Sequence, residues 1–441
     1  MQIMKFTYKL FPEWIQWLSK VPDYRVQARC RYSLYQTLFC GLSLFLLRHR
    51  SLRAFTIELR ANTKAQKNFQ RWIQFNDVPS DDEMRYILST VSTMSINGLL
   101  KNFHQRIERQ KILSQKSNAH KLLGKIELLS MDGTGQLSSD KIQCEKCLTR
   151  HSTDPQGQVL TKYLHGQLLL SLTALDAKYS LPFQFEPIER NDTETQYSKN
   201  DCELNAAKRA IQKLKTNFPK RSFCFLGDNL FAAQSVTELI RTNGWHFIFT
   251  AKPERNKELF FMWEYLKDRR QCLQWKDNKG HTHHYRWTEG LPLKQAKFKE
   301  AVPQVNLLFY EEISEQGEIV YKSSWITDIN IESENVKQIA KAGRARFSIE
   351  NRNFNEQKNL GFQSEHNFGH FGNLPNVFFG LQQIAQLITE LFRFWRPGAD
   401  WIKQAGSKRR YFETLAVLVA HTILPDDELP ILYLKFDFSS A

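Results

Sequence analysis

The sequence has few cysteines and no long apolar segment. Its seven cysteines, an odd number spread over 441 residues, do not suggest a disulfide framework, so we expect a reducing, cytosolic setting. The most apolar stretch near the start, residues 34–47, is interrupted by Gln36 and Thr37 and is shorter than the roughly 20 residues of a membrane helix. We therefore expect a soluble protein without a signal peptide, and residues 34–47 are predicted to form a buried helix.

Acidic residues are also in deficit. The chain has 61 Lys and Arg against 46 Asp and Glu, a net charge of +15 and a pI near 9.4. This excess favours a polyanionic partner, with nucleic acid first and a membrane surface second; the alternative is that the charge only aids solubility. The hydrophobic share of 41% and the charged share of 24% are ordinary for a globular protein and argue against disorder.

Hydrophobic periodicity predicts an α/β fold, a mixed sheet flanked by helices, with an all-α N-terminal region. Strands are expected at 125–131, 168–175, 181–188, 222–226 and 245–250, the second and third as a hairpin, with helices at 201–217 and 233–242. A β-rich insertion rich in aromatic residues follows, then a long helix from 333 to 359 ended by Gly361, and two C-terminal helices. The predicted regions are 1–120, 121–259, 260–330, 331–375 and 376–441.

Basic side chains alternate with Leu, Phe and Trp in one helical segment of the N-terminal region. They are Arg48, Arg50, Arg53, Arg60, Lys64, Lys67 and Arg71. A compact helical domain that presents these cations could bind the DNA backbone, and the alternative is a solvated basic face. The next helix is expected to begin after Ser80 as N-cap, with acidic residues in its first turn.

Two carboxylates follow apolar strands, and a third lies on the long helix. Asp132 and Asp228 end strands whose carboxyl ends would meet if the strands are adjacent, and a divalent cation would then neutralise the two charges. Either residue could instead cap a turn. Glu350 falls on the apolar stripe of Val336, Ala340, Gly343, Phe347 and Phe354, where a lone carboxylate is costly. Glu350 could complete a metal site, or form a structural i,i+4 pair with Arg346.

These residues carry a resemblance to a known family. The order Asp132, Asp228, β-rich insertion and R-x-x-x-E resembles the DDE transposases of bacterial insertion sequences, in the cut-and-paste group with a ribonuclease H-like core. The matching segments are SMDGTG at 130–135, FLGDNLF at 225–231 and IENRNFNEQKNLGFQSEHNFGH at 349–370, within roughly 124–370. That group's signature is Tyr-x2-Arg-x3-Glu-x6-Lys. The chain keeps Arg346 and Glu350 but has Gly343 in place of Tyr, and Lys358 lies one residue late.

The resemblance implies a transposase that cleaves DNA at element ends and transfers the strand into target DNA. It implies two Mg²⁺ ions, with Mn²⁺ as a substitute, held by Asp132, Asp228 and Glu350. Arg346 and Lys358 would contact phosphates. Arg53 and Arg60, from the basic helical segment, are predicted to be further DNA contacts. The partner is double-stranded DNA bearing terminal inverted repeats, bound by a homodimer in the bacterial cytoplasm. The alternatives are a transposase-derived DNA-binding protein without catalysis and a metal-dependent DNA nuclease.

Three further groups of residues have alternative interpretations. Cys144 and Cys147, with His151 and either Cys202 or His165, could hold a structural Zn²⁺, but free thiols in a loop are favoured. His366 and His370 are expected to hydrogen-bond a turn rather than approach DNA. The aromatic residues of the insertion, such as Trp287 and Trp325, could stack on a flipped base, and core packing is the favoured alternative.

Overall fold

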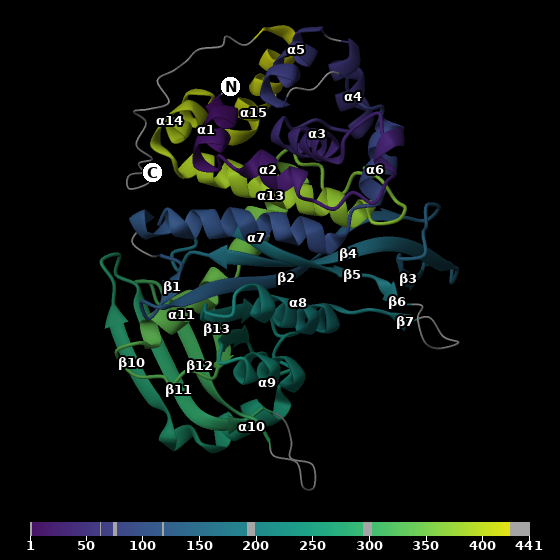
Figure 1. The fold of residues 1–441 in the computed structure, drawn as a ribbon. Helices are drawn as coiled ribbons and strands as arrows, with labels where there is room; N and C mark the ends of the chain where they lie inside the picture. The colour runs from purple at the N-terminus through teal and green to yellow at the C-terminus, as the bar shows by residue number, and fades with distance from the viewer. Residues whose placement is uncertain are drawn as a thin grey trace.

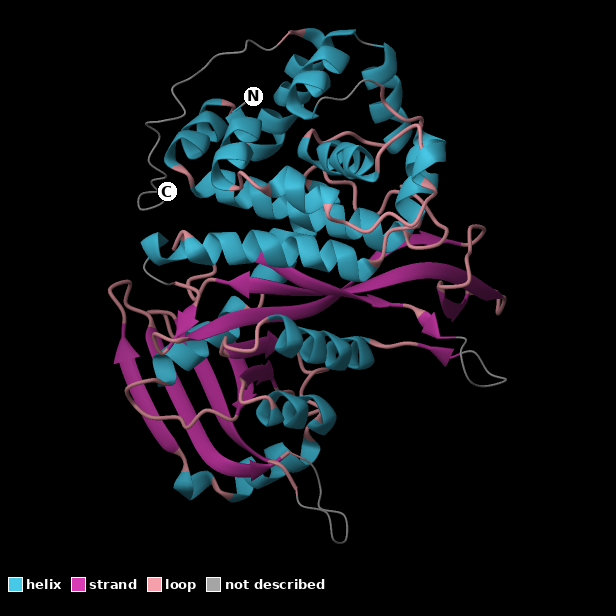
Figure 2. Cartoon of the chain, viewed as in Figure 1, coloured by secondary structure: helices cyan, strands magenta, loops and turns pink. Residues whose placement is uncertain are grey.

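The computed structural model describes residues 2–61, 63–73, 77–116, 119–191, 199–293 and 302–423. These residues form a mixed α/β structure in which helices lie on both sides of one large sheet (Figure 2), so the predicted mixed sheet flanked by helices is confirmed. Among the helices so described, none combines the length and the apolar character needed to cross a bilayer.

The large sheet has 11 strands, and its main path runs in the order β10-β11-β12-β13-β9-β8-β2-β4-β3, with β1 beside β2 and β5 beside β4. The strands are β1 (Lys121–Leu122), β2 (Ile126–Ser139), β3 (Leu148–Thr153), β4 (Val159–Thr173), β5 (Ser180–Ile188), β8 (Phe223–Gly227), β9 (His246–Thr250), β10 (Gln271–Lys276), β11 (Thr282–Pro292), β12 (Gln304–Ile313) and β13 (Ile319–Thr327). Strands β6 (Arg190–Asn191) and β7 (Lys199–Asn200) form a separate pair.

Strands β2, β8 and β9 are parallel neighbours, whereas β4 and β5 form the predicted antiparallel hairpin. The insertion strands β10 to β13 pair antiparallel with one another, and β13 then pairs with β9. The β-rich insertion therefore extends the central sheet and does not form a sheet of its own.

The helices fall into three groups (Figure 1). The N-terminal group is α1 (Gln2–Leu10), α2 (Trp14–Ser19), η1 (Gln27–Arg29), α3 (Leu34–Leu46), α4 (Leu52–Ala61), α5 (Thr63–Ile73), α6 (Asp81–Ser89), α7 (Thr93–Arg109) and η2 (Leu113–Lys116). The central group is α8 (Glu203–Asn217), α9 (Gln234–Thr242), α10 (Lys257–Tyr265), η3 (Lys267–Arg269), α11 (Val336–Ala345), the π-helical η4 (Ile349–Phe354) and α12 (Asn355–Asn359). The C-terminal group is α13 (Leu374–Phe394), α14 (Arg396–Gln404) and α15 (Lys408–His421).

Local sequence signals account for several helix positions. Helix α3 is almost wholly buried, as residues 34–47 predict. Helix α6 begins with the predicted N-cap, because the Ser80 side chain accepts from the Glu83 backbone and the Glu83 carboxylate accepts from the Ser80 backbone. Helix α12 ends before Gly361, whose φ of +102° is the left-handed conformation that glycine adopts most readily.

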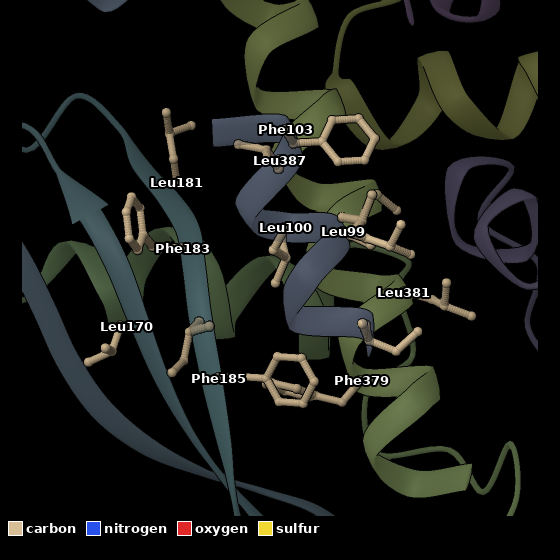
Figure 3. Close-up of a cluster of buried hydrophobic side chains, with 14 of the residues drawn as sticks. Leu99, Leu100, Phe103, Leu170, Leu181, Phe183, Phe185, Phe379, Leu381 and Leu387 are labelled. Carbon is tan, nitrogen blue, oxygen red and sulfur yellow. The ribbon is translucent and has the colours of Figure 1, made fainter. Parts of the chain in front are cut away.

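The main core lies between the sheet and the helices from the two ends of the chain. Figure 3 shows α7 between strands β4 and β5 on one side and α13 on the other, with Leu100 and Phe103 of α7 among Phe183 of β5 and Leu387 of α13. The two ends of the chain also pack together, since the Phe6 ring lies 5.4 Å from that of Phe392. The N-terminal and C-terminal helices thus form one helical layer over the sheet (Figure 1).

A buried ion network fastens this layer to the segment that carries Glu350. The Arg48 side chain is 1% exposed, donates to Glu356 of α12 at 2.9 Å and lies 3.3 Å from the centre of the Phe362 ring. Lys408 of α15 donates to Glu356 at 2.8 Å and also to Glu390 of α13. The sequence grouped Arg48 with the DNA-binding cations, and that prediction was wrong because its charge is neutralised inside the core.

We expect Glu356→Gln to lower the free energy of unfolding by about 3–5 kcal/mol, because it removes the carboxylate that pairs with buried Arg48 and with part-buried Lys408. Urea unfolding followed by circular dichroism measures this loss. The matched control is Glu413→Gln, whose ion pair with Arg409 is about half exposed and should be worth less than about 1 kcal/mol. Equal losses in the two variants would contradict the structural role of the network.

Candidate active site

Two aspartates lie on or directly after neighbouring parallel strands. Asp228 follows the last residue of β8, as predicted, whereas the predicted strand end at Asp132 is wrong, because β2 stays paired with β4 beyond Asp132 and continues to Ser139. Ser130 of β2 is aligned with Leu226 of β8, and Asp132 and Asp228 each come two residues later. Because side chains alternate along a strand, the two aspartates share a face of the sheet. The Asp132 carboxylate accepts from the Gly133 amide at 2.9 Å, and Asp228 accepts from the Leu230 amide at 2.8 Å. The two strands are adjacent, which is the condition under which the two carboxylates were expected to meet.

Glu350 also lies close to these aspartates, but the local structure around it differs from the predicted helix. The expected single helix over 333–359 is wrong, because α11 ends at Ala345 and residues 349–354 widen into a π-helix. Phe347 is 42% exposed and the Glu350 side chain 44% exposed, so neither occupies the predicted core-facing position. Tertiary bonds hold η4 in place, since the Asn353 side chain donates to the carbonyl of Ser180 at 3.1 Å. Single π-helical turns of this kind are frequent at functional sites.

Arg346 links the acids from different parts of the chain. Its Nη1 donates to Oε1 of Glu350 at 2.8 Å and lies 3.7 Å from Oδ2 of Asp132. The predicted Arg346–Glu350 pair is therefore present, and the guanidinium also faces the first aspartate. Burial raises the pKa of Asp132 to about 7; Arg346 opposes this rise, and the nearby charges of Glu350 and Asp228 add to it. The three predicted acids thus form one electrostatic group.

A fourth carboxylate, Glu203, lies near Asp228 and was not predicted from the sequence. It is the first residue of α8, and a Cβ atom placed on Gly133 would lie 2.4 Å from its carboxyl carbon. Burial, followed by the charge of Asp228, raises the pKa of Glu203. The periodicity of α8 does not distinguish Glu203 from other helical acids. The only local signal is the glycine after Asp132, which leaves the space that the Glu203 side chain occupies.

The departure from the transposase signature at Gly343 has a steric cause. A Cβ atom at Gly343 would lie 2.5 Å from Cε2 of Trp325, a residue of β13. Trp325 therefore fills the space next to α11 where the signature has a tyrosine. Trp325 and Trp287 are each 1% exposed, so both belong to the core, as the favoured alternative had it, and neither presents a face for stacking on a base.

An open cleft of about 640 Å³ lies next to this group and is lined by several cations, although Asp132, Asp228 and Glu350 themselves do not line it. Gly133 and Glu203 line it, together with Lys358, Arg150 and Lys162. Lys358 lies 3.1 Å from Glu365, which also lines the cleft. Arg150 and Lys162 are directly opposite each other on β3 and β4, an unfavourable pairing of like charges that a bound anion would relieve.

The other residues singled out from the sequence are the arginines of the basic helical segment and the suggested zinc ligands. Arg53 and Arg60 are exposed on α4 in the helical layer. The sulfur atoms of Cys144 and Cys147 are 3.7 Å apart in the connection between β2 and β3. Two of the suggested zinc ligands do not join them, because His151 is hydrogen-bonded to Thr161 and Cys202 is an exposed residue at the start of α8.

Because the pKa of Asp132 is raised in the folded protein, the free energy of unfolding should depend on pH. The folded protein holds the Asp132 proton more tightly than the unfolded chain does. The contribution of this proton to the free energy of unfolding is therefore complete below about pH 4 and is lost as the pH rises through about 7. We expect Asp132→Asn to raise the melting temperature relative to the wild type, and by more at about pH 8 than at about pH 5. Differential scanning fluorimetry in the presence of a chelator measures both proteins, and a constant difference would contradict the raised pKa.

Comparison with known proteins assigns the chain to no family. A scan against protein-family models and a search of curated proteins each gave no match for the chain. The functional interpretation therefore depends on the residues and the geometry of the site.

Proposed function

We propose that the chain is a DNA transposase of the DDE type, which cleaves DNA at element ends and transfers the strand into target DNA in a metal-dependent reaction. The convergence of Asp132, Asp228 and Glu350 next to Arg346 carries the proposal. It includes assignment of β5, β4, β2, β8 and β9, with their flanking helices, to a ribonuclease H-like core. The antiparallel β4–β5 hairpin beside three parallel strands, and the resemblance over 124–370, support that assignment.

The donor set fits divalent cations that prefer oxygen ligands. Asp132, Asp228 and Glu350 offer carboxylate oxygens from three separate parts of the chain, and Glu203 lies near Asp228. Their mutual repulsion contributes to the raised pKa of Asp132, and a cation would relieve it. When bound, two Mg²⁺ ions would neutralise charge on the attacking and leaving oxygens of a phosphodiester displacement.

The other residues of the site have roles that follow from their positions. Arg346 orients Glu350 and offsets part of the negative charge at Asp132. Lys358, Arg150 and Lys162 would bind phosphates of DNA lying in the adjoining cleft, where charge-assisted contacts fix the position of the backbone. As the resemblance implies, we propose a homodimer that binds paired element ends in the bacterial cytoplasm.

Removing one carboxylate should abolish chemistry and leave DNA binding intact. We expect Asp132→Asn, Asp228→Asn and Glu350→Gln each to lower cleavage by at least about 10²–10³-fold, as loss of one electrostatic group from an active site does. The substrate is duplex DNA taken from the two borders of the gene, incubated with Mg²⁺ and separated on a denaturing gel. The control is Glu254→Gln, a change at an exposed acid in the turn before α10.

The products of the same assay separate the three candidate functions. Cleaved and joined products support the transposase, cleaved products without joining indicate a nuclease, and a gel shift without cleavage indicates a DNA-binding protein. Wild-type activity in any one of the three acid variants would remove that residue from the site.

The exposed cations of α4 generate a separate prediction about DNA affinity. Arg53→Ala and Arg60→Ala should each weaken binding and reduce the slope of log K against log salt by about 1, because each removes one phosphate contact. Fluorescence anisotropy with labelled border DNA at several salt concentrations measures the slope. The control is Lys267→Ala, an exposed cation directly after α10, which lies at the opposite end of the molecule from α4 (Figure 1). An unchanged slope in both arginine variants would exclude α4 from the DNA interface.

A further inference from the structure

Four sulfur and nitrogen ligand atoms from three distant parts of the chain meet at one point. They belong to Cys144, Cys147, His165 and His370, and all lie within 4.8 Å of one another. The cysteines come from the β2–β3 connection, His165 from β4 and His370 from the segment that leads into α13. We propose that this cluster is a structural Zn²⁺ site, an inference that does not depend on the proposed transposase function.

Four of the six distances between the ligand atoms are within about 0.4 Å of those in a tetrahedral zinc site, and the other two are below 4.8 Å. With Zn–S near 2.3 Å and Zn–N near 2.0–2.1 Å, the tetrahedron has edges of about 3.8 Å between sulfurs and about 3.6 Å between sulfur and nitrogen. The observed separation of the two Sγ atoms is 3.7 Å. Nε2 of His165 lies 3.4 Å from Sγ of Cys144 and 3.5 Å from Sγ of Cys147. Nε2 of His370 lies 3.2 Å from Sγ of Cys147.

Alternatives without a metal explain this arrangement less well. A disulfide would bring the sulfurs to about 2.05 Å, so the observed 3.7 Å excludes one in this conformation. Hydrogen bonds without a metal would all run through sulfur, which is only a weak donor and a weak acceptor, so they account less well for four groups brought together in the interior. A cation at the centre would accept a lone pair from every one of these atoms.

The surroundings favour Zn²⁺ over a harder or an exposed ion. Cys147 and His165 are each 1% exposed, and two thiolates with two neutral imidazoles balance the charge of one Zn²⁺. Two sulfur and two nitrogen ligands in a tetrahedron are typical of zinc, whereas Mg²⁺ takes oxygen ligands. The Cys144 backbone amide donates to Sγ of Cys147 at 3.3 Å, which stabilises a thiolate. Four protein ligands leave no open position, so the site is structural rather than catalytic.

The ion would join segments that the sequence keeps far apart. Cys147 and His370 are 223 positions apart, and a bond through one ion would close this long loop. Next to the cluster, Nζ of Lys146 donates to Oδ1 of Asn373 at 2.8 Å, so the same two segments are already in contact. The site therefore anchors the segment after α12 to the edge of the central sheet.

The full-length protein, purified under reducing conditions without chelator, should contain about one equivalent of zinc by plasma mass spectrometry. X-ray absorption spectroscopy should give two sulfur and two nitrogen neighbours, and Co²⁺ substitution should give the visible spectrum of a tetrahedral thiolate site. These two measurements use the wild-type chain and do not depend on how a variant folds. Absence of bound metal after incubation with ZnCl₂, iron in place of zinc, or a shell without sulfur would overturn the proposal.

Variants then test the identity of the ligands. Cys147→Ser and His370→Asn should reduce bound zinc from one equivalent to near none, and EDTA should lower the melting temperature of the wild type but not that of these variants. Cys202→Ser and His151→Asn are matched controls of the same residue types outside the cluster, and both should retain one equivalent. Full zinc content in Cys147→Ser and His370→Asn would assign the metal to another site.

Discussion

The parallel register between β2 and β8 is the constraint on which the candidate active site depends. It places Asp132 and Asp228 side by side, and a shift of one residue would turn one of the two carboxylates to the opposite face of the sheet. All five residues of β8 are buried, so the apolar side chains on both faces fix the register. Packing in the core thus holds together two carboxylates whose charges repel each other.

The segment carrying Glu350 is held by charges from both ends of the chain. Arg48 comes from the end of α3 and Lys408 from the start of α15, and both donate to Glu356, six positions after Glu350. Removing a single partner would leave a buried charge without compensation, which makes the network cooperative. The helical layer is therefore coupled to the position of Glu350, although only Arg346 contacts that carboxylate with a positive charge among the described residues.

Sequence periodicity predicted the elements whose residues pack in regular patterns, such as the β4–β5 hairpin, α8, the first part of β2 and the strand that precedes Asp228. It failed where long-range contacts decide the local structure. The break after Ala345 depends on η4 bonding to Ser180, and the burial of Arg48 depends on a partner 308 positions away. Glu203 and His370 join their clusters only through the tertiary fold, so no local spacing identifies them.

Ligand chemistry keeps the two proposed metal sites distinct although one segment contributes to both. Residues 349–370 supply Glu350 to a group of carboxylates, which suits Mg²⁺, and His370 to a group of thiolates and imidazoles, which suits Zn²⁺. Lys358 lies between these two attachment points and faces the cleft. A segment fastened at both ends loses little additional entropy when Lys358 binds a phosphate, because its backbone is already ordered. The zinc cluster would in this way support DNA binding without contacting DNA.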